Sequence, residues 1–110
     1  MIIKLINIVL VGCNGYMGRV VTALVAENPS FSIIAGIDII TQEQSGYPVF
    51  ANPDKLNTGH NEIIKAANVV IDFSNPSAID SLLNLGISKS LPLILCATGY
   101  SPENIADIEN

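Results

Sequence analysis

The chain has 110 residues, of which 49% are hydrophobic and 14% are charged, and its formal net charge is −5. This length favours a single domain, and the apolar content excludes intrinsic disorder. The 5 Lys and Arg residues are scattered singly, which argues against a nucleic-acid partner, and no apolar run reaches the roughly 18 residues that a membrane span requires.

Two cysteines and one histidine limit the chemistry further. Cys13 and Cys96 lack metal-ligand spacing, and a single histidine excludes most zinc sites and histidine triads, so we expect no metal site. The two thiols indicate a reducing, cytoplasmic setting. An alternative is a lipoprotein leader ending in Leu-Val-Gly-Cys at Cys13, but the positive charge before it is limited to Lys4, and Asn7 interrupts its apolar segment.

The first predicted element is a strand from about Ile3 to Val11, followed by a turn with glycines at 12, 15 and 18 and by a helix from about Tyr16 to Glu27. The first N–H groups of a helix have no intrahelical acceptor, and the helix dipole is positive there, so a pyrophosphate can bind at that end. Gly12 suits the sharp turn, Gly15 a close approach of phosphate, and Gly18 tight packing of the helix. The motif alone is also compatible with a plain strand–helix turn.

A second strand, Phe31–Ile37, ends at Asp38, which lies 20 residues after Gly18. This is about where a carboxylate binds the ribose hydroxyls in a dinucleotide-binding unit, although Asp38 could also simply form a turn. The glycine turn and Asp38 together favour nucleotide binding.

Residues 39–60 are turn-rich, with a short edge strand expected at Val49–Phe50. This stretch is either a surface connection or a flap near the adenosine end of the site. His60 is expected to be an exposed residue near a helix start, without a catalytic role.

The remaining pattern continues to alternate strands with helices. It predicts a short helix over 62–67, a third strand over 69–73, a helix entered through Ser74-Asn75-Pro76, a fourth strand over 91–96, and a last helix that begins with Ser101 as its cap.

The fold class that follows is α/β, a Rossmann-like doubly wound parallel sheet with strand order 3-2-1-4, in one dinucleotide-binding domain over 1–110. In this order the carboxyl ends of strands one and four are neighbours at the topological switch point. The glycine turn, Asp38, the end of strand three and residues 96–99 should therefore converge on one rim.

Three motifs together resemble the N-terminal domain of the 4-hydroxy-tetrahydrodipicolinate reductase (dihydrodipicolinate reductase) family. They are Gly12-Cys13-Asn14-Gly15-Tyr16-Met17-Gly18-Arg19, Asp72-Phe73-Ser74-Asn75-Pro76 and Pro92 to Tyr100. The resemblance covers nearly the whole chain but less than half of the usual length of that family. It implies an NAD(P)H-dependent oxidoreductase of lysine and diaminopimelate biosynthesis. The cofactor-binding residues that it implies are Gly12, Cys13, Asn14, Gly15, Tyr16, Met17, Asp38, Phe73, Ser74, Cys96, Ala97 and Thr98.

Two positions depart from the family pattern. The family often has a basic residue where Tyr16 stands, and its fourth strand commonly ends in Gly-Thr-Thr-Gly where this chain has Cys96-Ala97-Thr98-Gly99. Contacts made by backbone N–H and C=O groups can survive both changes.

No catalytic residue is expected within the chain, because the resemblance places the proton donor and the substrate-binding segment in a C-terminal domain that does not match here. We therefore expect an isolated cofactor domain that does not turn over alone, exposes apolar surface towards its C-terminal end and tends to self-associate. The resemblance implies a homo-oligomer, a tetramer, for the intact enzyme, with no membrane partner.

Asp38 is followed by no Lys or Arg until Lys55, so NADH should be preferred over NADPH, which remains possible. A non-enzymatic nucleotide sensor or coenzyme A-binding module is the alternative function on this fold, and Asp38 favours the dinucleotide. Cys13 and Cys96 could lie near each other at adjacent strand ends, but two inert, buried thiols are the favoured interpretation.

Overall fold

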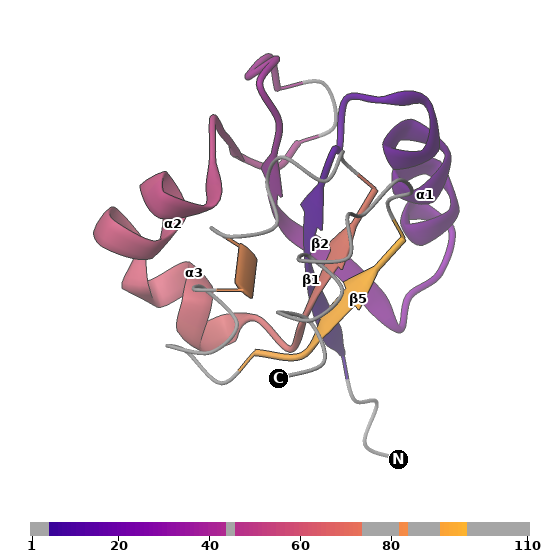
Figure 1. The fold of residues 1–110 in the computed structure, drawn as a ribbon. Helices are drawn as coiled ribbons and strands as arrows, with labels where there is room; N and C mark the ends of the chain where they lie inside the picture. The colour runs from indigo at the N-terminus through magenta and orange to yellow at the C-terminus, as the bar shows by residue number, and fades with distance from the viewer. Residues whose placement is uncertain (1–4, 44–45, 74–81, 84–90, 97–110) are drawn as a thin grey trace.

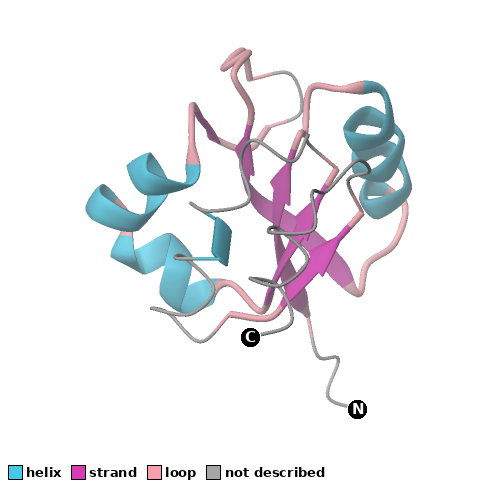
Figure 2. Ribbon diagram, viewed as in Figure 1, coloured by secondary structure: helices cyan, strands magenta, loops and turns pink. Residues whose placement is uncertain are grey.

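The computed structural model describes residues 5–43, 46–73, 82–83 and 91–96. Five parallel strands form one sheet in the order β3-β2-β1-β4-β5 (Figures 1 and 2). The strands are β1 (Ile6–Val11), β2 (Phe31–Ile37), β3 (Val49–Phe50), β4 (Val69–Asp72) and β5 (Leu93–Leu95).

The central strand β1 is buried because it is covered on both faces. Val9 and Leu10 are fully buried on opposite faces, as expected of an interior parallel strand that is apolar throughout. The polar Asn7 near its start is tied to the entry of β4: its backbone N–H donates to Asn68 Oδ1 at 2.7 Å, and its Nδ2 donates to the carbonyl of Ala66 at 2.8 Å. These bonds fix the lateral register of β1 against β4.

Helices cover the two faces of the sheet unequally (Figure 1). On one face α1 (Tyr16–Ala26) packs through Val21 and Val25 against β1 and β2. On the other face α2 (Pro53–Gly59) and α3 (Asn61–Ala66) contribute Leu56 and Ile64 to a larger apolar core. The result is a three-layer α/β/α arrangement, which confirms the predicted fold class.

The predicted order 3-2-1-4, with 69–73 as the third strand beside 31–37 and 91–96 as the fourth beside β1, differs from the observed sheet. That neighbour assignment is wrong because β3 occupies the free edge of β2, pairing Gly36 with Val49 and Ile37 with Phe50. β4 therefore pairs with β1, and β5 pairs with β4 instead of β1. The switch point consequently lies between the carboxyl ends of β1 and β4.

The stretch 39–60 holds more regular structure than its composition suggested. The short strand at Val49–Phe50 is confirmed. The Asn52-Pro53-Asp54 sequence is the start of α2: Asn52 Oδ1 accepts from the backbone N–H of Lys55 at 2.9 Å, and Pro53 opens the helix. His60 links α2 to α3 and is only partly exposed, with its ring 4.5 Å from that of Phe50.

Other element boundaries differ from the prediction by one to three residues. β1 begins at Ile6 instead of Ile3, α1 ends at Ala26, and β5 spans Leu93–Leu95 within the predicted 91–96. The helix entry at 74–76 and the last helix from Ser101 lie outside the described residues. Within the described part of the chain, no helix is long and apolar enough to cross a membrane.

Candidate functional site

The turn between β1 and α1 lies at the carboxyl end of the sheet, next to the end of β2. Gly12 has a φ of 78°, which is strained for residues with a side chain and confirms its role in the sharp turn. Its N–H donates to the carbonyl of Ile37 at 2.7 Å, and its carbonyl accepts from the N–H of Gly15 at 3.1 Å. The turn is thus held to β2 and closed on itself by backbone hydrogen bonds.

Gly18 is a glycine because α1 packs directly on this turn. A Cβ at Gly18 would come within 2.7 Å of both Cα and the carbonyl carbon of Cys13 and would also collide with the carbonyl oxygen of Gly12. All of these are backbone atoms, which cannot move aside without displacing the turn. The predicted packing role of Gly18 is therefore confirmed.

Gly15 is different, because the protein's own packing does not require a glycine there. Its φ is −79°, and the atom nearest to a Cβ added at this position would be the carbonyl oxygen of Gly12 at 3.4 Å, an ordinary van der Waals contact. The absence of a side chain at this position is therefore not explained by the fold and suits the approach of a ligand.

The N-terminus of α1 is open. Gly15 is the N-cap residue, no side chain caps the helix, and no acidic residue stands in the first turn. The side chains of Tyr16 and Met17 are exposed. The first backbone N–H groups and the positive end of the helix dipole are thus available to an anion.

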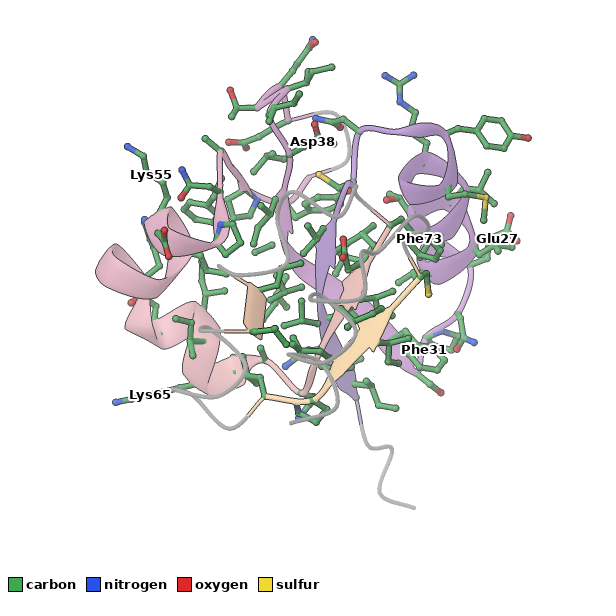
Figure 3. The ribbon with its side chains drawn as sticks, viewed as in Figure 1. Glu27, Phe31, Asp38, Lys55, Lys65 and Phe73 are labelled. Carbon is green, nitrogen blue, oxygen red and sulfur yellow. The ribbon has the colours of Figure 1, made fainter. Side chains whose placement is uncertain are left out.

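Asp38 lies directly after β2 and is held against the glycine turn (Figure 3). Its Oδ2 accepts from the backbone N–H of Asn14 at 3.0 Å, and its Oδ1 accepts from the backbone N–H of Ile40 at 2.9 Å. Each carboxylate oxygen keeps further acceptor capacity. Among the described residues no Lys or Arg pairs with Asp38, and Lys55 and Lys65 project from α2 and α3, away from it (Figure 3).

Asn14 is largely buried, and its side chain is turned towards the protein. Its Nδ2 donates to the carbonyl of Ile40 at 2.6 Å and to that of Gln42 at 3.0 Å. Its own carbonyl accepts from Arg19 Nε at 3.1 Å. Residues 40–42 are therefore fastened to the glycine turn by the side chain of Asn14.

Cys13 points beneath the turn and not out of it. Its Sγ packs so closely on β2 that a Cβ at Gly36 would lie 2.5 Å from it, and the Tyr47 ring covers the same place. Burial raises the pKa of the Cys13 thiol, and the nearby Asp38 charge adds to this rise. Burial also raises the pKa of Tyr47, whose hydroxyl lies 3.0 Å from Thr22 Oγ1. Cys13 can therefore serve a ligand through its backbone, while its thiol stays neutral and internal.

The rim is completed by the ends of β4 and β5. The N–H of Phe73 donates to the carbonyl of Val11 at 2.9 Å, so Phe73 lies beside the glycine turn at the switch point. The N–H of Cys96 donates to the carbonyl of Asp72 at 2.8 Å, which places Cys96 one strand further along. The predicted convergence holds for these residues, whereas Ser74, Ala97 and Thr98 lie outside the described residues.

Both cysteines are free thiols, so the structure contains no disulfide between them. Cys13 is buried as expected, but the expected burial of Cys96 is wrong, because Cys96 is exposed where it follows β5. Within the described ranges no group of acidic, histidine or cysteine side chains could hold a metal ion.

Sequence reasoning missed Gly36, Tyr47 and Thr22, which support the turn from below. A glycine inside an apolar strand is a signal of close approach by another group, so Gly36 could have been singled out. Tyr47 and Thr22 carry no local signal, because their contact joins residues 25 positions apart.

A groove of about 600 Å³ runs between α1 and the start of β2, lined among others by Thr22, Ala26 and Phe31. It includes neither the glycine turn nor Asp38, so it is separate from the rim.

The parallel α/β/α sheet, the glycine turn at the switch point and the acid at the end of β2 define a nucleotide-binding domain of the Rossmann class. The family model described as dihydrodipicolinate reductase, N-terminus, matches residues 6–110. The chain belongs to this family.

Relatives of known name agree. The chain is 39% identical over 103 residues to the 4-hydroxy-tetrahydrodipicolinate reductase of Clostridium novyi and 40% identical over 105 residues to that of Clostridium tetani. The two alignments cover 94% and 96% of the chain, respectively. It spans only 38% of the length of either relative.

Solved structures support the fold. A dipicolinate-bound dihydrodipicolinate reductase from Paenisporosarcina sp. TG-14 superposes with a TM-score of 0.71 at 20% identity, covering 94% of this chain and 41% of that one. GenD2 from gentamicin A biosynthesis, in complex with NAD, superposes with a TM-score of 0.63 at 14% identity, covering 86% of this chain and 27% of that one.

Proposed function

We propose that the chain binds a nicotinamide dinucleotide at the rim formed by the glycine turn, Asp38 and the end of β4. The observation that carries this proposal is that the uncapped N-terminus of α1 adjoins an acid placed to bind a ribose. The backbone N–H of Asn14, in the turn that leads into α1, donates to Asp38 Oδ2 at 3.0 Å. An anion site and an adjoining carboxylate are the two requirements for a pyrophosphate and the ribose attached to it.

The residues present fit such a ligand. The Gly12–Met17 turn would hold the pyrophosphate through the backbone N–H groups that begin α1, and the missing side chain at Gly15 leaves room for it. Asp38 would accept from the ribose hydroxyls with its remaining acceptor capacity. Phe73, at the switch point, would line the path to the nicotinamide, together with Ser74 and the 96–98 segment.

We further propose that the intact protein reduces 4-hydroxy-tetrahydrodipicolinate to tetrahydrodipicolinate in lysine and diaminopimelate biosynthesis, in the cytoplasm. This rests on the family and on the names of the relatives, which are more than twice as long as the chain. A bound reduced nicotinamide supplies a hydride, and the reaction also needs a positioned acid. We place that acid, the substrate-binding residues and the oligomer contacts in a C-terminal domain.

We also propose a preference for NADH over NADPH. The carboxylate of Asp38 favours a free 2′-hydroxyl and repels a 2′-phosphate. No Lys or Arg follows Asp38 before Lys55, and Lys55 projects from α2 away from Asp38 (Figure 3).

Calorimetric titration of the chain with NADH, NADPH and coenzyme A, alongside a turnover assay with the pathway substrate, tests these proposals. Binding of NADH without turnover is the expected result. Equal affinities for NADH and NADPH would refute the preference. Binding of coenzyme A but of neither dinucleotide would refute the cofactor assignment and favour a coenzyme A module.

A further inference from the structure

Asn14 joins the glycine turn to the 38–42 segment, by which we mean residues 38 to 42 directly after β2. Three of its hydrogen bonds run from the turn to this segment: the backbone N–H to Asp38 Oδ2, and Nδ2 to the carbonyls of Ile40 and Gln42. Asn14 is only 9% exposed. The bonds therefore form an internal clasp between the glycine turn and the 38–42 segment.

The clasp fixes what the 38–42 segment can offer a ligand. The N–H of Ile40 is committed to Asp38 Oδ1 at 2.9 Å, so it is not available to a phosphate. Ile39 and Ile40 are 89% and 56% exposed, and the next charged residue along the chain is the acidic Glu43. As held, the segment presents a carboxylate and apolar side chains beside the position assigned to the ribose.

The only arginine of the chain, Arg19, is held on the other side of Asn14. Its Nε donates to the Asn14 carbonyl from α1, whereas the 38–42 segment is bound by the Asn14 amide and N–H groups. The guanidinium of Arg19 is thus positioned by Asn14 as well.

We propose that Asn14 is a positioning residue that sets the preference for an unphosphorylated ribose by holding the 38–42 segment in place. This inference rests on the proposed dinucleotide function. A 2′-phosphate beside Asp38 requires the segment to move away or to turn N–H groups outward, and either change breaks bonds to Asn14. A free 2′-hydroxyl requires no such movement.

Direct contact of the Asn14 amide with the ligand is a weaker account, because both hydrogens of Nδ2 already have carbonyl acceptors within the protein. A purely structural role for Asn14 would weaken the binding of both dinucleotides by the same factor. The ratio of the two dissociation constants therefore separates positioning from general support.

The test compares the NADH and NADPH dissociation constants of the full chain, Asn14→Ala, Asn14→Ser and Gln42→Ala by calorimetry. We expect Asn14→Ala to bind NADH about tenfold more weakly, because the released 38–42 segment must be ordered again on binding, at a cost comparable to the two hydrogen bonds that the substitution removes. It should bind NADPH at most about threefold more weakly, because release of the segment offsets the loss. Asn14→Ser, which can donate to one carbonyl only, should fall between. Gln42→Ala keeps the carbonyl that Asn14 binds and should match the unsubstituted chain.

An unchanged NADPH-to-NADH ratio in both Asn14 variants, with NADH still bound by the unsubstituted chain, would overturn this inference and leave the proposed function intact. Failure of the unsubstituted chain to bind either dinucleotide would overturn both. Thermal unfolding of each variant shows whether it is folded, and if Asn14→Ala is not, the ratio measured for Asn14→Ser decides.

Discussion

Gly15 and Gly18 should respond differently to replacement by alanine. Gly18→Ala places a methyl group 2.7 Å from two backbone atoms of Cys13, about 0.7 Å closer than an ordinary contact allows. Overpacking of this kind costs about 1–3 kcal/mol, and the backbone neighbours put this site at the upper end. The better helix propensity of Ala returns about 1 kcal/mol. The net loss should be about 2 kcal/mol.

A loss of that size should lower the midpoint of thermal unfolding by about 10 °C for a domain of this length. Circular dichroism during heating measures it. Gly15→Ala is the matched control, because its methyl group meets only one atom at 3.4 Å and its φ is negative. We expect a change in stability within about 0.5 kcal/mol for Gly15→Ala, since the poorer N-cap is offset by a less flexible unfolded chain.

The two variants should diverge again in ligand binding. Gly15→Ala should bind NADH at least about tenfold more weakly while remaining folded, because its methyl group occupies the space assigned to the pyrophosphate. A Gly18→Ala domain as stable as the unsubstituted chain would refute the packing argument. A Gly15→Ala domain with unchanged NADH affinity would refute the assignment of the phosphate site.

Three further predictions follow from the thiols, the tyrosine and the uncovered apolar surface. Iodoacetamide should alkylate Cys96 in the folded chain and Cys13 only after unfolding, since Cys13 is buried and its pKa is raised; equal rates measured by mass spectrometry would contradict this. Burial raises the pKa of both Cys13 and Tyr47, so the folded protein favours their neutral forms. Their contribution to the free energy of unfolding is therefore complete below about pH 8.5 and is lost as the pH rises through their folded-state pKa values. Urea unfolding across pH 7 to 11 measures this loss. Leu24 and Ile94 are 63% and 49% exposed, and a small apolar groove lies between α1 and Ile71, so sedimentation velocity should show self-association of the 110-residue chain; a strictly monomeric profile at high concentration would count against it.

Local physics explains which parts of the fold the sequence predicted. The unit from β1 through the glycine turn to Asp38 was predicted almost residue by residue, because its apolar strands and the turn glycines each leave a signal within a few positions. Asn, Pro and Asp occur both in turns and at helix starts, so the turn-rich composition of 39–60 did not predict that Asn52-Pro53-Asp54 begins a helix. The hydrogen bond from Lys55 N–H to Asn52 Oδ1 distinguishes the two cases.

Lateral strand order carries no comparable local signal. The placement of β4 depended on whether Val49–Phe50 would take the free edge of β2, which two residues of sequence do not determine. The support beneath the turn was missed for a related reason, since Tyr47 reaches Thr22 and Cys13 only through the folded chain. Asn14 was predicted as a cofactor contact, but its side chain is committed to residues 40 and 42.

The most direct test of the central claim is an NMR titration of the isotopically labelled chain with NADH, followed through its backbone amides. We predict that the largest shifts occur for Gly12–Met17, Asp38 and Phe73, which surround the open end of α1 at the rim. Shifts confined to the separate groove at Ala26–Ile33, or no shifts at all at saturating NADH, would contradict the assignment of this rim as the dinucleotide site.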